Sequence, residues 1–526
     1  MSRALAILGV VLVLASPTSV LAQESKRQQT LDNARAKIME GEMWAEAEEY
    51  ETALERWREG YVALLPMFRE LPFKHPVQAR YLTREELGSF VLEEMAEEYP
   101  DEEIEAERLA FSRLGFYDPD LDLKELITTL FTEEIAGFYD PDEKALFLIR
   151  ETPTDETAAP SPEDEKPEPE EPEDEKPRGF LERLFGGDDE EEEVLAFDPA
   201  EEQLTLAHEL IHALTDQHHD LLSMSRSAEH DDDMMLAQSA LMEGDASLAM
   251  LIEPFDEELG RYVLQRRSLS LMMRWSMRFA LPTSGDDTFS RAPLLYRESL
   301  LFPYVEGFAF CQSLTSEGSW APVDRAYKDP PLSTEQILHP EKYPKTSRKY
   351  DPPMEITLPD GMPLDSEAWK LVDQNVLGEL AIGLLFRPEL GRRKSERAAE
   401  GWDGDRYAVF ARRDAPGETA LIWVSTWDTE KDAKQFAEAF VKMRSPQSKP
   451  RKESRKTEAG TEYVESFVSS RGSASLIRRG VDVIVLEDLP EGAHETARRW
   501  AGNFGKNLKT YTLEKHDAAN PFPGEK

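Results

Sequence analysis

Apolar and polar residues follow a helical period through much of the chain. Apolar positions recur every three to four residues from about 25 to 135 and again from 200 to about 316. This spacing gathers apolar side chains on one face and predicts amphipathic helices. Between the two stretches, the turn residues Gly137–Asp142 lead into the short apolar run Ala145–Ile149. We expect a strand over that run, just upstream of the second group of helices.

The pattern changes near Asp365, where alternating polar and apolar runs follow one helical segment. Alternation with a period of two predicts strands. Strands are expected at Tyr407–Ala411, Ala420–Ser425, Glu462–Val468 and Val481–Leu486, and helices at 430–443 and 492–505. We therefore predict a small, largely antiparallel α+β domain over 361–515 and a tail at 516–526. The whole chain is assigned to the α+β class, with mainly helical regions at 23–150 and 196–360.

Length and charge narrow the class of protein. A chain of 526 residues is too long for one compact core, so at least two folded units are expected. The formal net charge of −44 excludes binding to nucleic acid or anionic lipid through a general positive field. Residues 151–195 hold 19 acidic and 4 basic side chains among many prolines, which predicts a disordered insertion.

The first 22 residues have the features of a secretory signal peptide. Arg3 supplies a positive charge, Ala4–Ala15 an apolar stretch, and Val20–Ala22 a cleavage site before Gln23. We expect cleavage there and a secreted or periplasmic mature protein. An uncleaved anchor is disfavoured because the apolar stretch is shorter than the ~20 residues that a bilayer requires. No stable membrane span is therefore expected after cleavage.

One predicted helix carries a metal-binding pattern. Asp198 suits a helix cap and Pro199 the first helical position. In the helix that follows, His208 and His212 lie four residues apart and hence on one face, while Glu209 is rotated by ~100°. Two imidazoles can therefore meet one cation with a carboxylate beside them.

Zinc fits this arrangement because it accepts imidazole nitrogen and carboxylate oxygen in a tetrahedron that leaves one position for water. The metal acidifies that water, and Glu209 can take its proton and pass it to a leaving amine. The competing interpretation is a chance His-Glu-x-x-His on an ordinary helix, for which we expect roughly 0.02 matches in a chain of this length. We therefore predict Zn²⁺ as the cofactor and amide hydrolysis as the chemistry.

The third ligand has two candidates. Glu243 lies 31 residues after His212 on another predicted helix, where a carboxylate would complete the site. His218 is the rival, because His208, His212 and His218 have the spacing of the metzincin pattern. That pattern needs a glycine where this chain has Thr215, so we favour Glu243.

With these residues the sequence resembles the zincin metallopeptidases, and among them the gluzincins, in which two motif histidines and a downstream glutamate hold zinc. The local resemblance covers His208 to Glu243 and implies a peptide or protein substrate, with Glu209 as general base. A longer pattern is similar to a group of exported bacterial metallopeptidases of unknown substrate. Its segments are Ala136–Pro141, Ala207–Gln217, Glu243–Ala246, Ser333–Pro340 and Gly401–Tyr407. The acidic insertion departs from that pattern.

The zincin resemblance implies two further parts. One is a strand beside the metal helix that pairs with extended substrate, and the other is a His, Tyr or Arg that stabilises the oxyanion. We expect Ala145–Ile149 to be the strand and His339, backed by Tyr343 and Tyr327, to be the catalytic residue. A purely structural His339 stays open, as does Asp245 as a residue that orients a ligand histidine.

The sequence thus predicts an exported zinc metallopeptidase, with two alternatives from other classes. In the first, the helical N-terminal region and the C-terminal domain form an envelope or interaction protein whose zinc site is inactive. In the second, the centre hydrolyses amides that are not peptides. Loss of turnover in Glu209→Gln would argue against the first alternative, and product analysis would separate the second.

Overall fold

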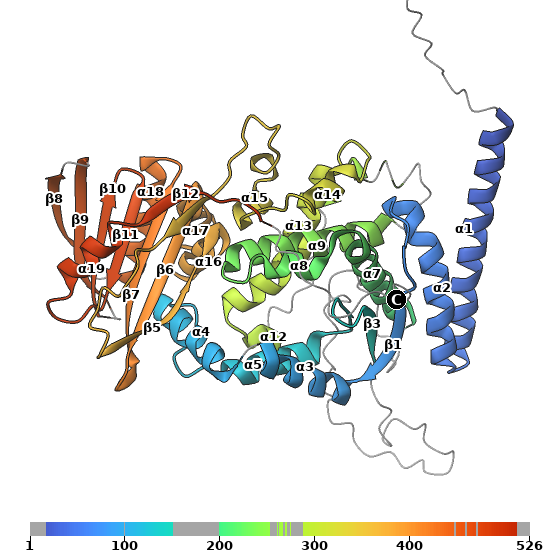
Figure 1. The fold of residues 1–526 in the computed structure, drawn as a ribbon, viewed down its shortest axis with the longest axis horizontal. Coiled ribbons are helices and arrows are strands. Elements are labelled where there is room, and N and C mark those ends of the chain that lie inside the picture. The colour runs from blue at the N-terminus through green and yellow to red at the C-terminus, as the bar shows by residue number, and fades with distance from the viewer. Residues whose placement is uncertain are drawn as a thin grey trace, which may run out of the picture.

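The structure of the protein is a computed structural model. It describes residues 17–98, 100–150, 199–252, 288–445, 449–457, 460–469 and 472–512, with residues 260, 262, 264–266, 269, 270 and 274. Most helices of the first two thirds of the chain lie on one side of the molecule, and the sheet of the last third lies on the other (Figure 1). The predicted α+β class is confirmed.

The N-terminal part places helices around a three-stranded sheet. Its elements are α1 (Pro17–Glu46), α2 (Tyr50–Arg69), β1 (Gln78–Thr83), α3 (Arg84–Glu98), α4 (Asp101–Leu114), α5 (Leu123–Glu134), β2 (Gly137–Asp140) and β3 (Ala145–Arg150). The strand expected at Ala145–Ile149 is β3, which runs one residue further. The strand order is β1-β3-β2, with β1 parallel and β2 antiparallel to β3. Because β3 is covered on both faces, its sequence is a continuous apolar run.

A helical layer packs against this sheet. It contains α7 (Pro199–His219), α8 (Leu221–Arg226), α9 (Asp232–Ile252), α12 (Thr288–Arg291), α13 (Leu294–Leu314), α14 (Ala321–Ala326), α15 (Thr334–Leu338) and the 3₁₀ turn η1 (Pro340–Lys342). Helices α9 and α13 cross so closely that a Cβ on Gly244 would lie 2.2 Å from the carbonyl carbon of Gly307. Glycine at both positions lets the two backbones touch. On α9 the point of contact is the residue after Glu243, so the crossing fixes the position of Glu243.

The C-terminal part is a seven-stranded antiparallel sheet in the order β5-β6-β7-β11-β10-β9-β8. Its elements are β4 (Met354–Thr357), β5 (Trp369–Asn375), α16 (Gly378–Leu390), α17 (Arg392–Ala399), β6 (Trp402–Arg412), β7 (Ala415–Trp427), α18 (Glu430–Arg444), β8 (Arg451–Thr457), β9 (Gly460–Ser469), β10 (Gly472–Arg479), β11 (Asp482–Glu487), α19 (His494–Ala501) and β12 (Gly505–Leu508). Tyr407 and Val409 share a core with α16, α17 and α18, whereas Ala408 and Phe410 share one with α19. The alternating sequence of β6 therefore fills two apolar layers.

Within the seven-stranded sheet, three strands were not anticipated from the sequence, and the helix expected after the sheet ends early. Strands β5 and β8 are the two edges of the sheet. Charged residues at a sheet edge prevent it from pairing with another chain. In these two strands they also interrupt the alternation of polar and apolar residues that predicts a strand. Strand β10 has small and polar residues in its first half. The helix expected over 492–505 ends at Ala501, and Gly505–Leu508 instead forms β12, which pairs with β4.

The N-terminal helices belong to two cores. Helices α1 and α2 share a core with α7, α9 and α13, whereas α4 joins the core of the C-terminal sheet through Phe111 and Leu114. Charge reinforces that second contact, because buried Glu487 lies 3.1 Å from Arg444 Nε and 3.5 Å from Arg113 of α4. The N-terminal helical part and the C-terminal sheet are therefore packed together rather than merely linked.

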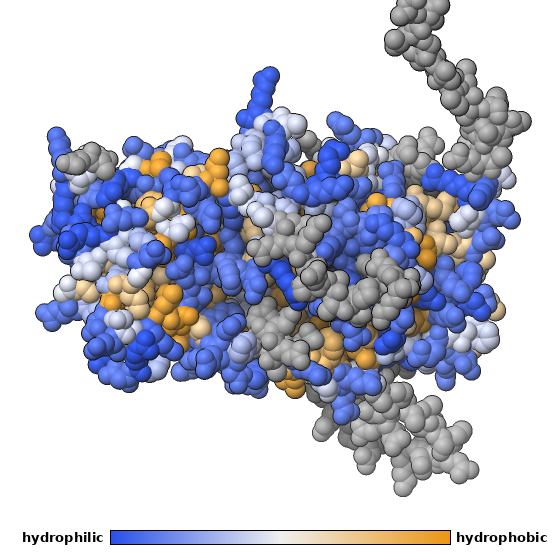
Figure 2. All heavy atoms as spheres, viewed as in Figure 1, coloured by the Kyte–Doolittle hydropathy of each residue, from blue (hydrophilic) through white to orange (hydrophobic). Residues whose placement is uncertain are grey.

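Within the part of the chain that the structure describes, no helix is both long and apolar enough to cross a bilayer. The visible face of the molecule is mostly hydrophilic (Figure 2), in keeping with the many charged residues of the sequence. The insertion expected over 151–195 lies outside the described residues, as do residues 1–16 of the expected signal. Helix α1 begins at Pro17, inside the span expected to be the signal.

Candidate metal centre

Helix α7 forms the base of the site. It runs from Pro199 to His219 without a break, and His208, Glu209 and His212 are all buried along it. Asp198, the expected cap, lies outside the described residues. An unbroken helix puts both imidazoles on one face, as the four-residue spacing requires.

Three donor atoms from α7 and α9 converge on one point. Glu243 Oε2 lies 2.9 Å from His208 Nε2 and 3.4 Å from His212 Nε2, and the two imidazole nitrogens are 3.1 Å apart. Ligands at zinc bond lengths in a tetrahedron are separated by about 3.3 Å. The donor set and its spacing therefore fit a zinc ion.

Electrostatics within the cluster show what a cation would do there. Burial lowers the pKa of His212, but the Glu243 carboxylate outweighs that effect and raises it to about 9. Conversely, the two histidines hold the pKa of Glu243 well below its usual range despite the cost of burial. A proton shared among these groups balances the buried charge, and a bound metal would displace it.

Glu209 lies beside the three donors. Its carboxylate is buried and receives a hydrogen bond from the backbone N–H of Tyr139 in β2. Burial raises its pKa above the usual range for glutamate, even though the neighbouring histidines oppose the shift. A carboxylate with a raised pKa near a metal-bound water has the property of a general base.

Strand β2, rather than β3, borders the metal pocket. Gly137, Phe138 and Tyr139 of β2 line it together with Glu209 and His212. The expectation that Ala145–Ile149 pairs with substrate is wrong, because β3 is the central strand and both of its edges are already paired. Sequence reasoning missed β2 because only four residues form it, within what reads as a turn.

A buried aspartate fastens β2 to the metal helix. Asp216 Oδ2 accepts hydrogen bonds from the Tyr139 hydroxyl at 2.8 Å and from Lys144 Nζ at 2.9 Å. Its other oxygen accepts the backbone N–H of Leu221 at 3.0 Å. Asp216 lies one helical turn after His212, so this network fixes the position of β2 relative to His212.

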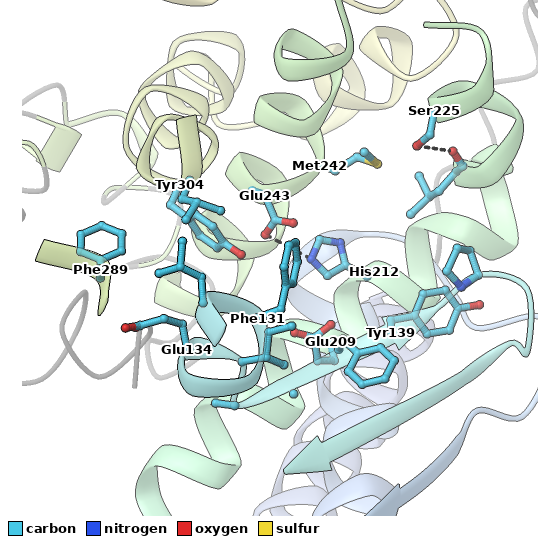
Figure 3. A pocket seen from close by; sticks show the side chains of 18 of the residues that line it. Phe131, Glu134, Tyr139, Glu209, His212, Ser225, Met242, Glu243, Phe289 and Tyr304 are labelled. Atoms are coloured by element: carbon cyan, nitrogen blue, oxygen red, sulfur yellow. Dashed lines mark hydrogen bonds and ion pairs between the residues drawn. The ribbon is translucent and has the colours of Figure 1, made fainter. Parts of the chain in front are cut away.

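The pocket around these groups is largely apolar. It encloses about 370 Å³. Figure 3 shows Glu209, His212, Glu243 and Tyr304 arranged around it. Its apolar walls include Leu130, Phe131, Phe138, Met242, Phe289 and Leu300. Apolar walls of this kind strengthen electrostatic interactions between the polar groups of the pocket.

The structure does not bring His339 to the cluster of His208, His212 and Glu243. His339 Nε2 lies 3.1 Å from Glu379 Oε1, and both residues line a different cavity. The catalytic assignment of His339 is therefore corrected. Its motif, Ser333–Pro340, forms α15 and the turn after it, and Ser333 caps that helix.

Tyr304 of α13 occupies the place expected of a second catalytic group. Its phenol makes a hydrogen bond to Glu243, and its ring stacks 5.9 Å from the ring of His208. Sequence reasoning missed it because an aromatic residue in an apolar helix is usually part of a core. Only the packing of α13 on α9 reveals the contact.

Two other candidates have structural partners. His218 Nε2 lies 2.8 Å from the carbonyl oxygen of Pro72, outside the donor cluster, and α7 continues past it without a bend. Asp245 pairs with buried Arg69 at 2.7 Å and accepts a hydrogen bond from Tyr327 at 2.9 Å. Asp245 thus anchors α2 to α9, and the described residues offer no hydrogen-bond partner to Nδ1 of His208.

Residues 369–498 match a family described as a domain of unknown function (DUF8575). Comparison with curated proteins and with solved structures gave no match. The matched segment begins at the first residue of β5 and ends within α19, so it covers the seven-stranded sheet. The metal centre lies outside it.

One acidic cluster, which includes Asp428 of the DUF8575 segment, has the spacing of a cation site. Glu335, Asp351 and Asp428 bring their carboxylates together. Lys342 Nζ lies 2.7, 2.8 and 3.0 Å from them, respectively. The lysine ammonium is the cation of this cluster, so the cluster reads as an ion-pair network.

Proposed function

We propose that the protein is an exported zinc-dependent metallopeptidase. The observation that carries the proposal is the convergence of His208, His212 and Glu243 at 2.9–3.4 Å, with Glu209 beside them in one pocket. Two imidazoles and two carboxylates that meet in an apolar pocket can together hold a metal ion and activate a water for hydrolysis. The resemblance to gluzincins supports the same ligand set.

In this proposal His208, His212 and Glu243 would hold zinc, and the chemistry that the ion would supply there is acidification of a water and polarisation of the scissile carbonyl. Glu209 takes the proton of that water and delivers it to the departing amine. The N–H of Tyr139 orients the Glu209 carboxylate for both steps.

The edge of β2 supports a peptide as the substrate. Ala136 accepts a hydrogen bond from Ile149 N at 2.8 Å. Since bonding direction alternates along a strand, Gly137 and Tyr139 turn their backbone groups away from β3. The Tyr139 N–H is donated to Glu209, so an extended peptide would use the other outward-facing groups of this edge to lie across the metal site.

We assign to Tyr304 the role first expected of His339. Its phenol is within the pocket and close to Glu243. A donor there can stabilise the negative oxygen that develops on the scissile carbonyl.

Activity of wild type and Glu209→Gln on a mixed peptide library tests the proposal. We expect wild type to cut peptide bonds and the variant to lose turnover by about 10²–10⁴-fold while keeping its zinc. Mass spectrometry of the products would identify the bond. Zinc binding without any cleavage by wild type would favour the interaction-protein alternative instead.

A further inference from the structure

A second cavity, of about 640 Å³, lies on the other side of α13 from the metal. Tyr296, Leu300 and Tyr304 face the metal pocket, whereas Leu301, Phe302 and Val305 line the second cavity. Opposite faces of one helix therefore separate two cavities. Helices α16 and α17 supply the far wall of the second one.

An ion pair between part-buried His339 and buried Glu379 forms part of its wall. Glu379 is 6% exposed, and its Oε1 lies 3.1 Å from His339 Nε2. Glu379 raises the pKa of His339 mainly through that hydrogen bond, which favours the charged imidazolium. The His339 side chain is 34% exposed, so it can meet a ligand while Glu379 holds it.

The arginines around the cavity fall into two groups. Arg274, Arg387 and Arg392 are paired with Glu306, Glu298 and Glu396. Arg393 and Arg397 lie four residues apart on α17, and neither has an ion-pair partner among the residues that the structure describes. Glu379 balances the charge of His339, and Glu400 is the one acid of the lining without an ion-pair partner among the described residues. The two arginines therefore leave a net positive charge in one cavity of a strongly acidic protein.

We propose that this cavity binds an amphipathic carboxylate. Its charged group lies against Arg393, Arg397 and His339, and its apolar body lies on Leu301, Phe302 and Val305. Guanidinium groups match carboxylates in shape as well as charge. The C-terminal end of an apolar peptide and a fatty acid share this chemistry.

Calorimetric titration of the full chain with N-acetylphenylalanine and with decanoate tests the proposal. N-acetylphenylalanine amide is the uncharged control. We expect at least one carboxylate to bind and the amide to bind about tenfold or more weakly than its acid. Tighter binding of N-acetylphenylalanine would identify a peptide terminus as the source, and tighter binding of decanoate a fatty acid. Measurable binding of N-acetylphenylalanine and of its amide with equal affinity, or no binding of either carboxylate, would overturn the proposal.

Variants locate the binding site. Arg393 and Arg397 are both exposed. The double variant Arg393→Ala/Arg397→Ala should weaken carboxylate binding by about tenfold or more, and His339→Gln should weaken it to a smaller extent. Arg451→Ala/Arg455→Ala on β8 removes two exposed arginines at the same spacing and should change nothing. Carboxylate binding at the zinc would survive loss of Arg393 and Arg397, so unchanged affinity in that variant contradicts the proposal. The readout needs no turnover, so it is independent of the proposed peptidase activity.

Discussion

At the level of single residues, some side chains of the site can be identified from the sequence, whereas others come close to it only through the tertiary fold. His208, Glu209 and His212 could be predicted because a helix fixes their relative positions. Glu243 could be proposed but not placed, since its distance from His208 depends on how α9 packs on α7. Tyr304 and Asp216 carried no signal, because their roles arise from tertiary contacts.

Replacing Tyr304 by phenylalanine tests its assigned role. We expect kcat to fall by about 10²-fold or more with little change in KM, because the phenol acts on the transition state. Zinc content should stay that of wild type. Tyr343→Phe, which removes a hydroxyl that donates to Asp329, is the matched control and should keep wild-type kcat. Equal kcat for both variants would remove Tyr304 from the mechanism.

Asp233 predicts how stability depends on pH. Burial raises the pKa of this carboxyl from 3.8 to about 8, although Lys509 opposes the shift. Between these values the folded state holds a proton that the unfolded state releases, so stability falls as pH rises from about 4 to 8. Urea unfolding should show that the free energy of unfolding of wild type falls by roughly 2 kcal/mol or more relative to that of Asp233→Asn between about pH 4 and 8. Parallel pH profiles for the two proteins would contradict this account.

At the scale of elements, the α9–α13 crossing holds Glu243 and Tyr304 together. Gly307→Ala would place a Cβ 2.0 Å from the carbonyl oxygen of Ala240, so the helices must separate. We expect a loss of about 1–3 kcal/mol in the free energy of unfolding and weaker zinc binding. Chemical denaturation and a zinc competition assay measure the two effects.

Gly383→Ala is the control for that helix variant. It is also a glycine inside a helix, but its new Cβ would lie 3.7 Å from Ala399 Cβ, an ordinary contact. We expect unchanged or slightly increased stability, since alanine restricts the unfolded chain. If both variants behave alike, the close crossing is not what positions Glu243.

At the scale of the whole molecule, buried Glu487 joins the C-terminal sheet to α4. Arg444→Ala removes its nearer partner and also the hydrogen bond to Leu114 O at 2.6 Å. We expect destabilisation by about 3–5 kcal/mol, because a buried charge loses its main partner. Thermal melts of Arg444→Ala and the exposed Arg451→Ala compare the two losses, and equal melting temperatures would contradict a structural role for Glu487.

The sequence predicted the α+β class and the interior strands β6, β7, β9 and β11 of the large sheet, because buried strands carry a strong apolar pattern. The interior strand β10 escaped because its first half is small and polar. Edge strands β5 and β8 escaped because their residues are polar. The division of the N-terminal helices between two cores also escaped, since local periodicity does not say which partner a helix face meets.

Metal content by elemental analysis tests the central claim most directly, on wild type, Glu243→Ala and His218→Ala. We expect about one zinc per chain in wild type and in His218→Ala, and a large loss in Glu243→Ala, because three protein ligands hold the ion. Absence of zinc from wild type, or full zinc retention by Glu243→Ala, would contradict it.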